Sequence, residues 1–369
     1  MARSALTDTV PQHGGVQVLP TLAISSSMAS LTAMAMALLL TCGTCTRTAL
    51  AIEAGTAAVG RGHQLSSPRR QASALTVGEY AVFAGGYTHG SGNNAATASR
   101  AIDVFDADAR LVGTYELRIG RGAIAATSWH DLAFFAGGQD EHKNNTAVME
   151  IFNVTSRTIV SVQNLTSARA MASAVTVGDF VLVAGGEASS GCFEPCKPGD
   201  SRVVDIWDAR RARWVSHEGA LSVPRKKMAA ATAGGKAFFG AGFSSEEHRS
   251  MSSVDIWDSA TQAWSTTNLS SARMRIQSAS LTARDGTEYA LFIGGLGEFA
   301  QPDGTPYATG GFCTTVDIYN ARTGEWSWTN LSRGRYEFSV AEVGTPRDTI
   351  IVSGGKQASI STSHTFYDP

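Results

Sequence analysis

Short apolar segments recur along most of this chain. Two of them, residues 80–84 (YAVFA) and 180–184 (FVLVA), are apolar at consecutive positions, so both faces of a strand would be apolar. A strand of that kind is buried between two layers. Each segment ends in a Gly-Gly pair, which suits a backbone that takes positive φ or lies close to another chain. The pattern predicts short, buried β-strands that end in tight turns.

The apolar segment and its glycine pair belong to an internal repeat. The segment that begins at Gln64 (QLSSPRRQASALTVGEYAVFAGG) aligns without a gap with the segment that begins at Asn164 (NLTSARAMASAVTVGDFVLVAGG). Six copies follow one another with a period of about fifty residues. Their pairs are Gly85-Gly86, Gly137-Gly138, Gly185-Gly186, Ala241-Gly242, Gly294-Gly295 and Gly354-Gly355.

A second block, with an acid before an aromatic residue, follows in five of the copies. It reads AIDVFDA at Ala101 and VVDIWDA at Val203, and tryptophan follows it at Trp214, Trp264 and Trp326. Its acids are Asp103, Glu150, Asp205, Asp255 and Asp317. The glycine pair, the acid–aromatic block and the spaced tryptophan together resemble kelch repeats, from about residue 64 to the end of the chain.

The resemblance implies an all-β, six-bladed β-propeller in which each copy supplies four short strands. One such sheet cannot bury both faces alone, whereas a closed ring of them leaves only short, protected edges. The expected blades are residues 65–118, 119–166, 167–222, 223–270, 271–332 and 333–369.

The last copy is one strand short. Strands are expected near residues 338–343, 349–353 and 363–367, after which the sequence ends. We expect residues 56–63 to supply the missing strand, so that an N-terminal strand completes the last blade. The alternative is a blade of three strands.

Residues 1–51 have the pattern of a targeting segment. The apolar run from Leu31 to Leu40 is too short to span a bilayer and fits a signal peptide. Ala49 and Ala51 are small residues of the kind signal peptidase recognises, which predicts cleavage after Ala51 and a mature domain over 52–369. Met28 as the true start and an organelle transit peptide are alternatives. We expect a secreted protein without a transmembrane span.

Glycosylation motifs and cysteines agree with export. Cys192 and Cys196 are a candidate disulfide pair in an oxidising compartment, and Cys313 is expected to be unpaired. Metal-ligand spacing is absent, so neither a metal nor another cofactor is predicted. The N-glycosylation candidates are Asn144, Asn153, Asn164, Asn268 and Asn330, although three of them share one repeat position and could serve its turn instead.

An arginine recurs before the first strand of every copy, where it could bind a ligand. The six are Arg69, Arg121, Arg169, Arg225, Arg275 and Arg335. In a propeller they would surround one mouth of the central channel, where guanidinium groups suit carboxylate, phosphate or sulfate. The competing interpretation is a structural role, either in pairs with the acids of the second block, which recur almost as regularly as the arginines, or in bonds to backbone carbonyls.

The amino-acid composition limits the kinds of binding partner to be expected. Lys and Arg number 30 against 32 acids, so the basic excess expected of a nucleic-acid-binding protein is absent. The favoured function is a monomeric, non-enzymatic scaffold that recognises a protein or carbohydrate, with anionic ligands among the candidates. The site is expected on the face that carries the b–c and d–a loops, where a to d are the strands of a blade from the axis outward. The alternative is a metal-independent sugar-acid mutarotase.

Overall fold

The computed structural model describes residues 51–53, 64–88, 96–188, 199–297, 311–343, 349–353 and 355–357. Within these ranges the secondary structure is β, with no helix. The strand predicted at 56–63, the strand predicted at 363–367, the pair Cys192 and Cys196, and the leader before Ala51 lie outside the described residues.

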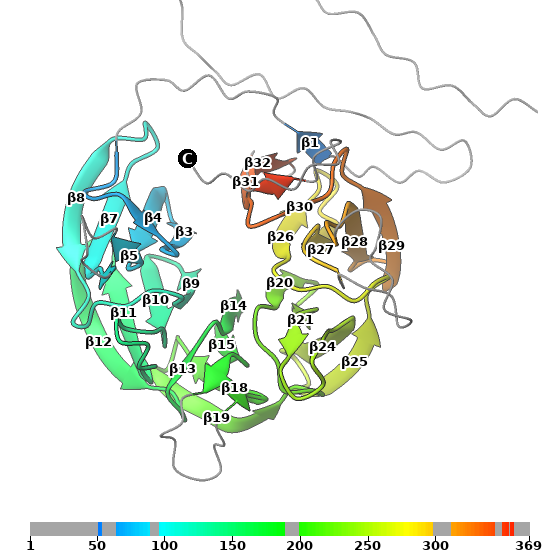
Figure 1. Cartoon of the computed structure of the whole chain (residues 1–369), viewed down its shortest axis with the longest axis horizontal. Coiled ribbons are helices and arrows are strands. Elements are labelled where there is room, and N and C mark those ends of the chain that lie inside the picture. The colour runs from blue at the N-terminus through cyan, green and yellow to red at the C-terminus, as the bar shows by residue number, and fades with distance from the viewer. Residues whose placement is uncertain are drawn as a thin grey trace, which may run out of the picture. The chain divides into compact units, whose positions relative to one another are not determined.

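The chain forms one antiparallel four-stranded sheet for each of the first five copies (Figure 1). Sheet 1 is β3 (Ser73–Val77), β4 (Tyr80–Ala84), β7 (Ala101–Phe105) and β8 (Leu111–Glu116). Sheet 2 is β9 (Ala125–Trp129), β10 (Leu132–Ala136), β11 (Val148–Asn153) and β12 (Thr158–Asn164). Sheet 3 is β14 (Ser173–Val177), β15 (Phe180–Ala184), β18 (Val203–Asp208) and β19 (Arg213–Ala220). Sheet 4 is β20 (Ala229–Ala233), β21 (Lys236–Gly240), β24 (Ser253–Asp258) and β25 (Trp264–Asn268). Sheet 5 is β26 (Gln277–Thr282), β27 (Glu288–Ile293), β28 (Thr315–Asn320) and β29 (Glu325–Asn330).

Sheet 6 differs from the others. It contains β31 (Ser339–Val343) and β32 (Thr349–Ser353), as predicted, and β1 (Ala51–Glu53), which pairs with β32 in parallel. The N-terminal strand was expected upstream of Gln64 at the outer edge of this sheet. In the structure, β1 lies directly against β32, in the place that the third strand occupies in the other sheets, while the strand predicted at 56–63 lies outside the described residues and stays a prediction.

Two-residue strands occur in copies 1, 3, 4 and 6, and isolated β-bridges take a similar place in copies 2 and 5. In the first copy, β2 (Arg69–Arg70) pairs with β5 (Tyr87–Thr88), which pairs with β6 (Thr97–Ala98). The other short strands are β13 (Arg169–Ala170), β16 (Glu187–Ala188), β17 (Gly199–Asp200), β22 (Phe243–Ser244), β23 (Arg249–Ser250), β30 (Arg335–Tyr336) and β33 (Lys356–Gln357).

The glycine pair joins consecutive copies. The amide of Gly138 donates to the carbonyl of Arg169 in the next copy at 3.0 Å, with a φ of +105°. A Cβ on Gly138 would stand 2.8 Å from the Gly122 carbonyl oxygen. Glycine is therefore required here both by the backbone angle and by the close neighbour.

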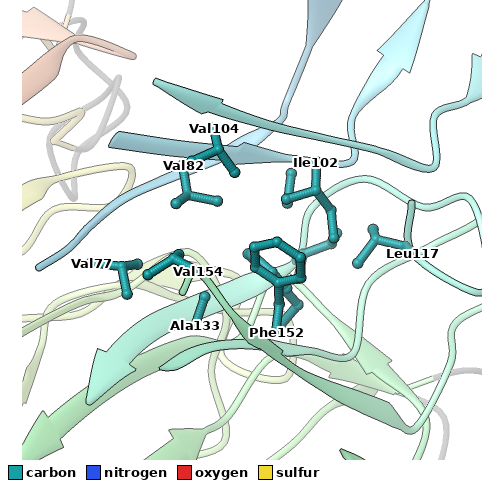
Figure 2. Packing of buried hydrophobic residues seen from close by; sticks show 11 residues of the cluster. Val77, Val82, Ile102, Val104, Leu117, Ala133, Phe152 and Val154 are labelled. Atoms are coloured by element: carbon teal, nitrogen blue, oxygen red, sulfur yellow. The ribbon is translucent and has the colours of Figure 1, made fainter. Parts of the chain in front are cut away.

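Hydrophobic clusters lie between neighbouring sheets. Figure 2 shows the cluster between sheets 1 and 2, in which Val82 and Ile102 face Ala133 and Phe152. Four further clusters join sheets 2 and 3, 3 and 4, 4 and 5, and 5 and 6. Each large side chain in them contributes about 1.5–3 kcal/mol through burial. A sheet that packs against a neighbour on each side explains why its second strand is apolar on both faces.

The first strands of consecutive sheets contact one another in the order β3, β9, β14, β20, β26 and β31. Hydrogen bonds connect these strands to the next copy, such as Ser73 Oγ to the Ile124 carbonyl at 2.7 Å and Ser173 Oγ to the Met228 carbonyl at 2.6 Å. The prediction of repeated four-stranded sheets is thus confirmed, whereas their closure into a ring stays a prediction.

Candidate functional site

The repeated arginines and the repeated acids form buried ion pairs. Arg121 donates to Glu150 at 2.6 Å, and Arg169 donates to Asp205 at 2.5 Å, with all four side chains fully buried. Arg69 pairs with Asp103 at 2.8 Å and Arg225 with Asp255 at 2.6 Å. Each pair lies within a single copy. The competing structural interpretation therefore describes the geometry of these four arginines.

Backbone groups complete each pair. One Arg169 nitrogen, Nη2, donates to the Val183 carbonyl as well as to Asp205, and the Thr166 amide donates to the other Asp205 oxygen at 3.1 Å. The same amide position contacts the acid in the other sheets, through Ser66, Arg118, Ser222 and Ser270. A buried charge needs hydrogen-bond partners of this kind, because a buried charge without a partner strongly destabilises the fold.

The fifth arginine was assigned to the wrong residue. The buried member of sheet 5 is Arg273, which pairs with Asp317, whereas Arg275 is 37% exposed and contacts Glu337. The Arg273 carbonyl accepts the amide of Gly242, as the Arg169 carbonyl accepts that of Gly138. The longer hairpin in this copy shifted the sequence count by two residues. Arg335 of the sixth copy is buried.

Burial and hydrogen bonds act on these charges in opposite directions. Desolvation raises the pKa of Asp103, but hydrogen bonds from Thr114, Ser66 and Arg69 outweigh it, so the pKa lies below its ordinary value. Burial lowers the pKa of Arg121 despite its contact with Glu150. Arg121 nevertheless remains charged at physiological pH, because a guanidinium group is not deprotonated in proteins.

The residues two positions after the buried arginines form a second set, here called the rim positions. They are Gln71, Ala123, Met171, Lys227, Arg275 and Glu337, and all six have positive φ. The amides of Ala123, Met171, Lys227 and Arg275 each donate to the carbonyl of the preceding rim position. Sequence reasoning missed this set because its side chains differ from copy to copy and only the backbone is shared.

The rim positions stand beside a cavity of about 920 Å³. Its lining comes from the first strands of all six sheets and includes Ile124, Ala172, Met228 and Ile276, each of which directly follows a rim position. Glu342 is the one ionisable side chain among the lining residues that the structure describes. We call this space the central cavity.

Two rim positions, Lys227 and Arg275, lie near two further cations, Lys226 and Lys356. Arg275 contacts Glu337, Lys356 lies 3.6 Å from the same carboxylate, and both cations lie within 6 Å of the Tyr336 ring centre, at 5.9 and 5.7 Å. Burial lowers the pKa of Lys227, and repulsion by Arg275 and Lys226 lowers it further. The nearby carboxylates of Glu187 and Asp200 act in the opposite direction and raise it. Lys227 has no ion pair among the described residues. We call the cations Lys226, Lys227, Arg275 and Lys356, together with the carboxylates of Glu187, Asp200 and Glu337, the rim cluster, in which the cations outnumber the acids by one.

The loops between second and third strands lie on the same side as the rim cluster. Lys226 Nζ bonds Glu187 at 2.9 Å and lies 3.5 Å from Asp200, both of which belong to such a loop. Bonds between consecutive loops are Tyr87 Oη to Gln139 O (2.8 Å), Asn145 Nδ2 to Glu187 O (2.7 Å) and Ser245 Oγ to Asp200 Oδ1 (3.1 Å). The b–c loops of copies 1 to 4 are thus joined in sequence by hydrogen bonds, and Lys226 ties the third of them to a d–a connection.

The remaining residues predicted as sites differ in how exposed they are. Cys313 is a free thiol, half-buried, and burial raises its pKa. Asn144, Asn164, Asn268 and Asn330 are exposed, whereas Asn153 is half-buried. Across the described ranges no group of three metal-ligating side chains occurs, and no helix is long and apolar enough to cross a membrane.

Comparison with known proteins adds no relative: no family model matches the chain, and no curated protein matches it in sequence. The class that the structure defines is therefore an all-β protein built from repeated, small, antiparallel four-stranded sheets.

Proposed function

We propose that the chain is a secreted, six-bladed kelch-type propeller that serves as a binding scaffold for an acidic protein or glycan. The ligand would bind on the face formed by the b–c loops and the rim positions. The observation that carries the proposal is the rim cluster, in which four cations, Lys226, Lys227, Arg275 and Lys356, outnumber the three carboxylates of Glu187, Asp200 and Glu337.

Two observations support ring closure. The first strands contact one another from β3 through to β31, and the central cavity is lined by all six of them. Five apolar interfaces join six sheets, which leaves one sheet face at each end that closure would bury. Burying those faces against each other follows the logic by which propellers remove exposed edges.

The positions of the arginines determine which of them could act in recognition. Arg69, Arg121, Arg169 and Arg225 have fully buried guanidinium groups committed to acids, so an external anion would have to break those pairs. Arg275 and Lys227 instead lie at the mouth of the cavity. An acidic ligand would gain charge-assisted hydrogen bonds there without disturbing the core.

The binding proposal is tested on an array of acidic peptides and of sulfated or uronate-containing glycans, probed with the full chain. For the best array ligand, Arg275→Ala and Lys227→Ala should each weaken binding about tenfold, as expected for loss of one charge-assisted hydrogen bond. Melting temperatures should stay within a few degrees of the wild type because neither residue is in the core.

Arg322→Ala is the matched control. Arg322 is 58% exposed and pairs with Asp285 at the opposite ends of the strands, so its loss should leave affinity unchanged. Unaltered affinity of both rim variants, or an equal loss in Arg322→Ala, would contradict the proposed site.

The sugar-acid isomerase alternative rests on the central cavity, which is large enough for a monosaccharide and has Glu342 in its lining. Exchange between anomers of a uronic acid, followed by NMR with and without the protein, separates the two functions. Accelerated exchange that disappears in Glu342→Gln would favour the enzyme over the scaffold.

A further inference from the structure

Trp328 is an exposed aromatic side chain that the fold itself does not explain. Its side chain is 64% exposed, more than any other large hydrophobic residue in the described ranges. It lies on β29, the outermost strand of sheet 5, where its partner across the ladder is the buried acid Asp317. In sheets 1 and 4 the residue opposite the acid is a threonine, Thr114 or Thr266. Among the described outer strands, only that of sheet 5 presents an indole at this position.

Asn330 follows Trp328 by two residues on the same strand. Residues i and i+2 of a strand point to the same face and are about 6.6 Å apart along the strand. Asn330 is exposed, and its Oδ1 accepts a hydrogen bond from Thr314 Oγ1 at 3.0 Å. Its Nδ2 atom, to which an N-glycan attaches, has no hydrogen bond to the described residues.

We propose that Asn330 carries an N-linked glycan whose first N-acetylglucosamine packs against the indole of Trp328. The apolar C–H face of a pyranose matches an aromatic face in shape, and it would cover an indole that otherwise remains in water. The proposal rests on entry of the chain into the secretory pathway and is independent of the ligand proposed for the rim cluster.

The other candidates lack this combination. Asn144 and Asn153 donate their Nδ2 groups to Asp140 and Asp131, at 2.9 and 2.7 Å, so a glycan would remove those bonds. Asn164 follows Val162 at the same spacing, which offers no aromatic face. The aromatic therefore distinguishes one motif from the rest.

Asn268 is a control supplied by the chain. It has the same motif, Asn-Leu-Ser, and the same position at the end of an outermost strand, β25. Its Oδ1 also accepts a hydroxyl hydrogen bond, from Ser252 Oγ at 3.3 Å. Thr266 stands where sheet 5 has Trp328.

The test uses the full chain, sent through the secretory pathway of cultured animal cells by an added leader. Glycopeptide mass spectrometry measures occupancy at Asn330 and Asn268, and hydroxyl-radical footprinting measures the oxidation rate of Trp328. We expect Asn330 to be occupied. Oxidation of Trp328 should be about threefold slower than in Asn330→Gln, because a sugar would cover much of an indole that is 64% exposed.

Asn268→Gln should leave the oxidation of Trp328 unchanged. An unoccupied Asn330, or equal oxidation of Trp328 with and without the glycan, would overturn the proposal. The glycan measurements do not involve the array ligand, and the binding measurements on the rim variants do not involve the glycan. A negative result for one proposal therefore leaves the other unaffected.

Discussion

At the residue scale, the most consequential feature is the ion pair repeated inside the sheets. Asp205 illustrates it: the carboxylate is fully buried, bonded to Arg169, and capped by the Thr166 amide. A buried pair of this kind contributes little compared with an apolar core, yet it is costly to break because one charge then lacks a partner. The repeated pair thus explains why two charged residues recur in every complete copy.

The first prediction concerns this pair. Arg169→Ala should lower the free energy of unfolding by about 3–5 kcal/mol, because Asp205 would remain buried without its cation. Urea unfolding followed by tryptophan fluorescence measures it. Arg210→Ala removes a cation that is 75% exposed and 3.8 Å from its acid, and should cost under about 1 kcal/mol. Similar losses in the two variants would show that burial of the pair is unimportant.

Sequence reasoning at this scale recognised the pair but not the rim. The acid and the arginine recur with regular spacing, so their pairing could be predicted for sheets 1 to 4. In sheet 5 two arginines flank Met274, and spacing alone selected Arg275 over the buried Arg273. The rim positions share only a backbone angle, and their side chains range from Ala123 to Arg275. No sequence pattern marks them.

At the element scale, β1 takes a place that the sequence assigned to another segment. Its register sets Glu53 opposite Val352. In sheet 1 the repeated acid Asp103 is paired with Phe83, which lies two positions before the glycine pair of its copy. Val352 likewise lies two positions before the glycine pair of the sixth copy. Glu53 therefore occupies the position of the repeated acid in sheet 6. β1 lies outside the repeat and runs parallel to its neighbour, whereas the third strands of the other sheets run antiparallel to theirs. Sequence alignment of the copies therefore could not identify β1 as a strand of sheet 6.

The register gives a prediction for sheet 6. Deleting residues 51–53 should speed amide hydrogen exchange in β31 and β32 about tenfold or more, because β32 would lose its backbone partner β1 and with it more than about 1 kcal/mol of local stability. Sheets 2 to 4 should exchange at their usual rates. Glu79→Gln, an exposed residue in the turn of sheet 1, provides the control. Unchanged exchange in β31 and β32 would assign β1 no stabilising role.

At the scale of the whole molecule, the sequence predicted a sheet for each copy and the four antiparallel strands of the first five. The period of about fifty residues gave six copies. The two apolar faces of each second strand predicted that sheets would pack on both sides, as the five clusters confirm. Closure is harder to derive because β1, which pairs with β32 in sheet 6, lies outside the repeat.

Closure is also what gives the rim cluster its functional meaning. If sheet 6 meets sheet 1, Glu337 and Lys356 join Gln71 at a complete mouth around the central cavity. If the sheets remain open, these residues lie at the end of an array instead. The binding proposal therefore depends on the distance between β31 and β3.

Pulsed electron paramagnetic resonance between spin labels on the first strands measures that distance most directly. The five cysteines are first replaced, and labels are then placed at Thr76 in β3 and Glu342 in β31. Thr232 and Ser280, whose hydroxyls are 3.3 Å apart in adjacent sheets, provide the neighbour distance, and Thr76 with Thr232 provides the distance across three sheets. A closed ring predicts that Thr76 and Glu342 give the neighbour distance. A value longer than that between Thr76 and Thr232 would contradict closure.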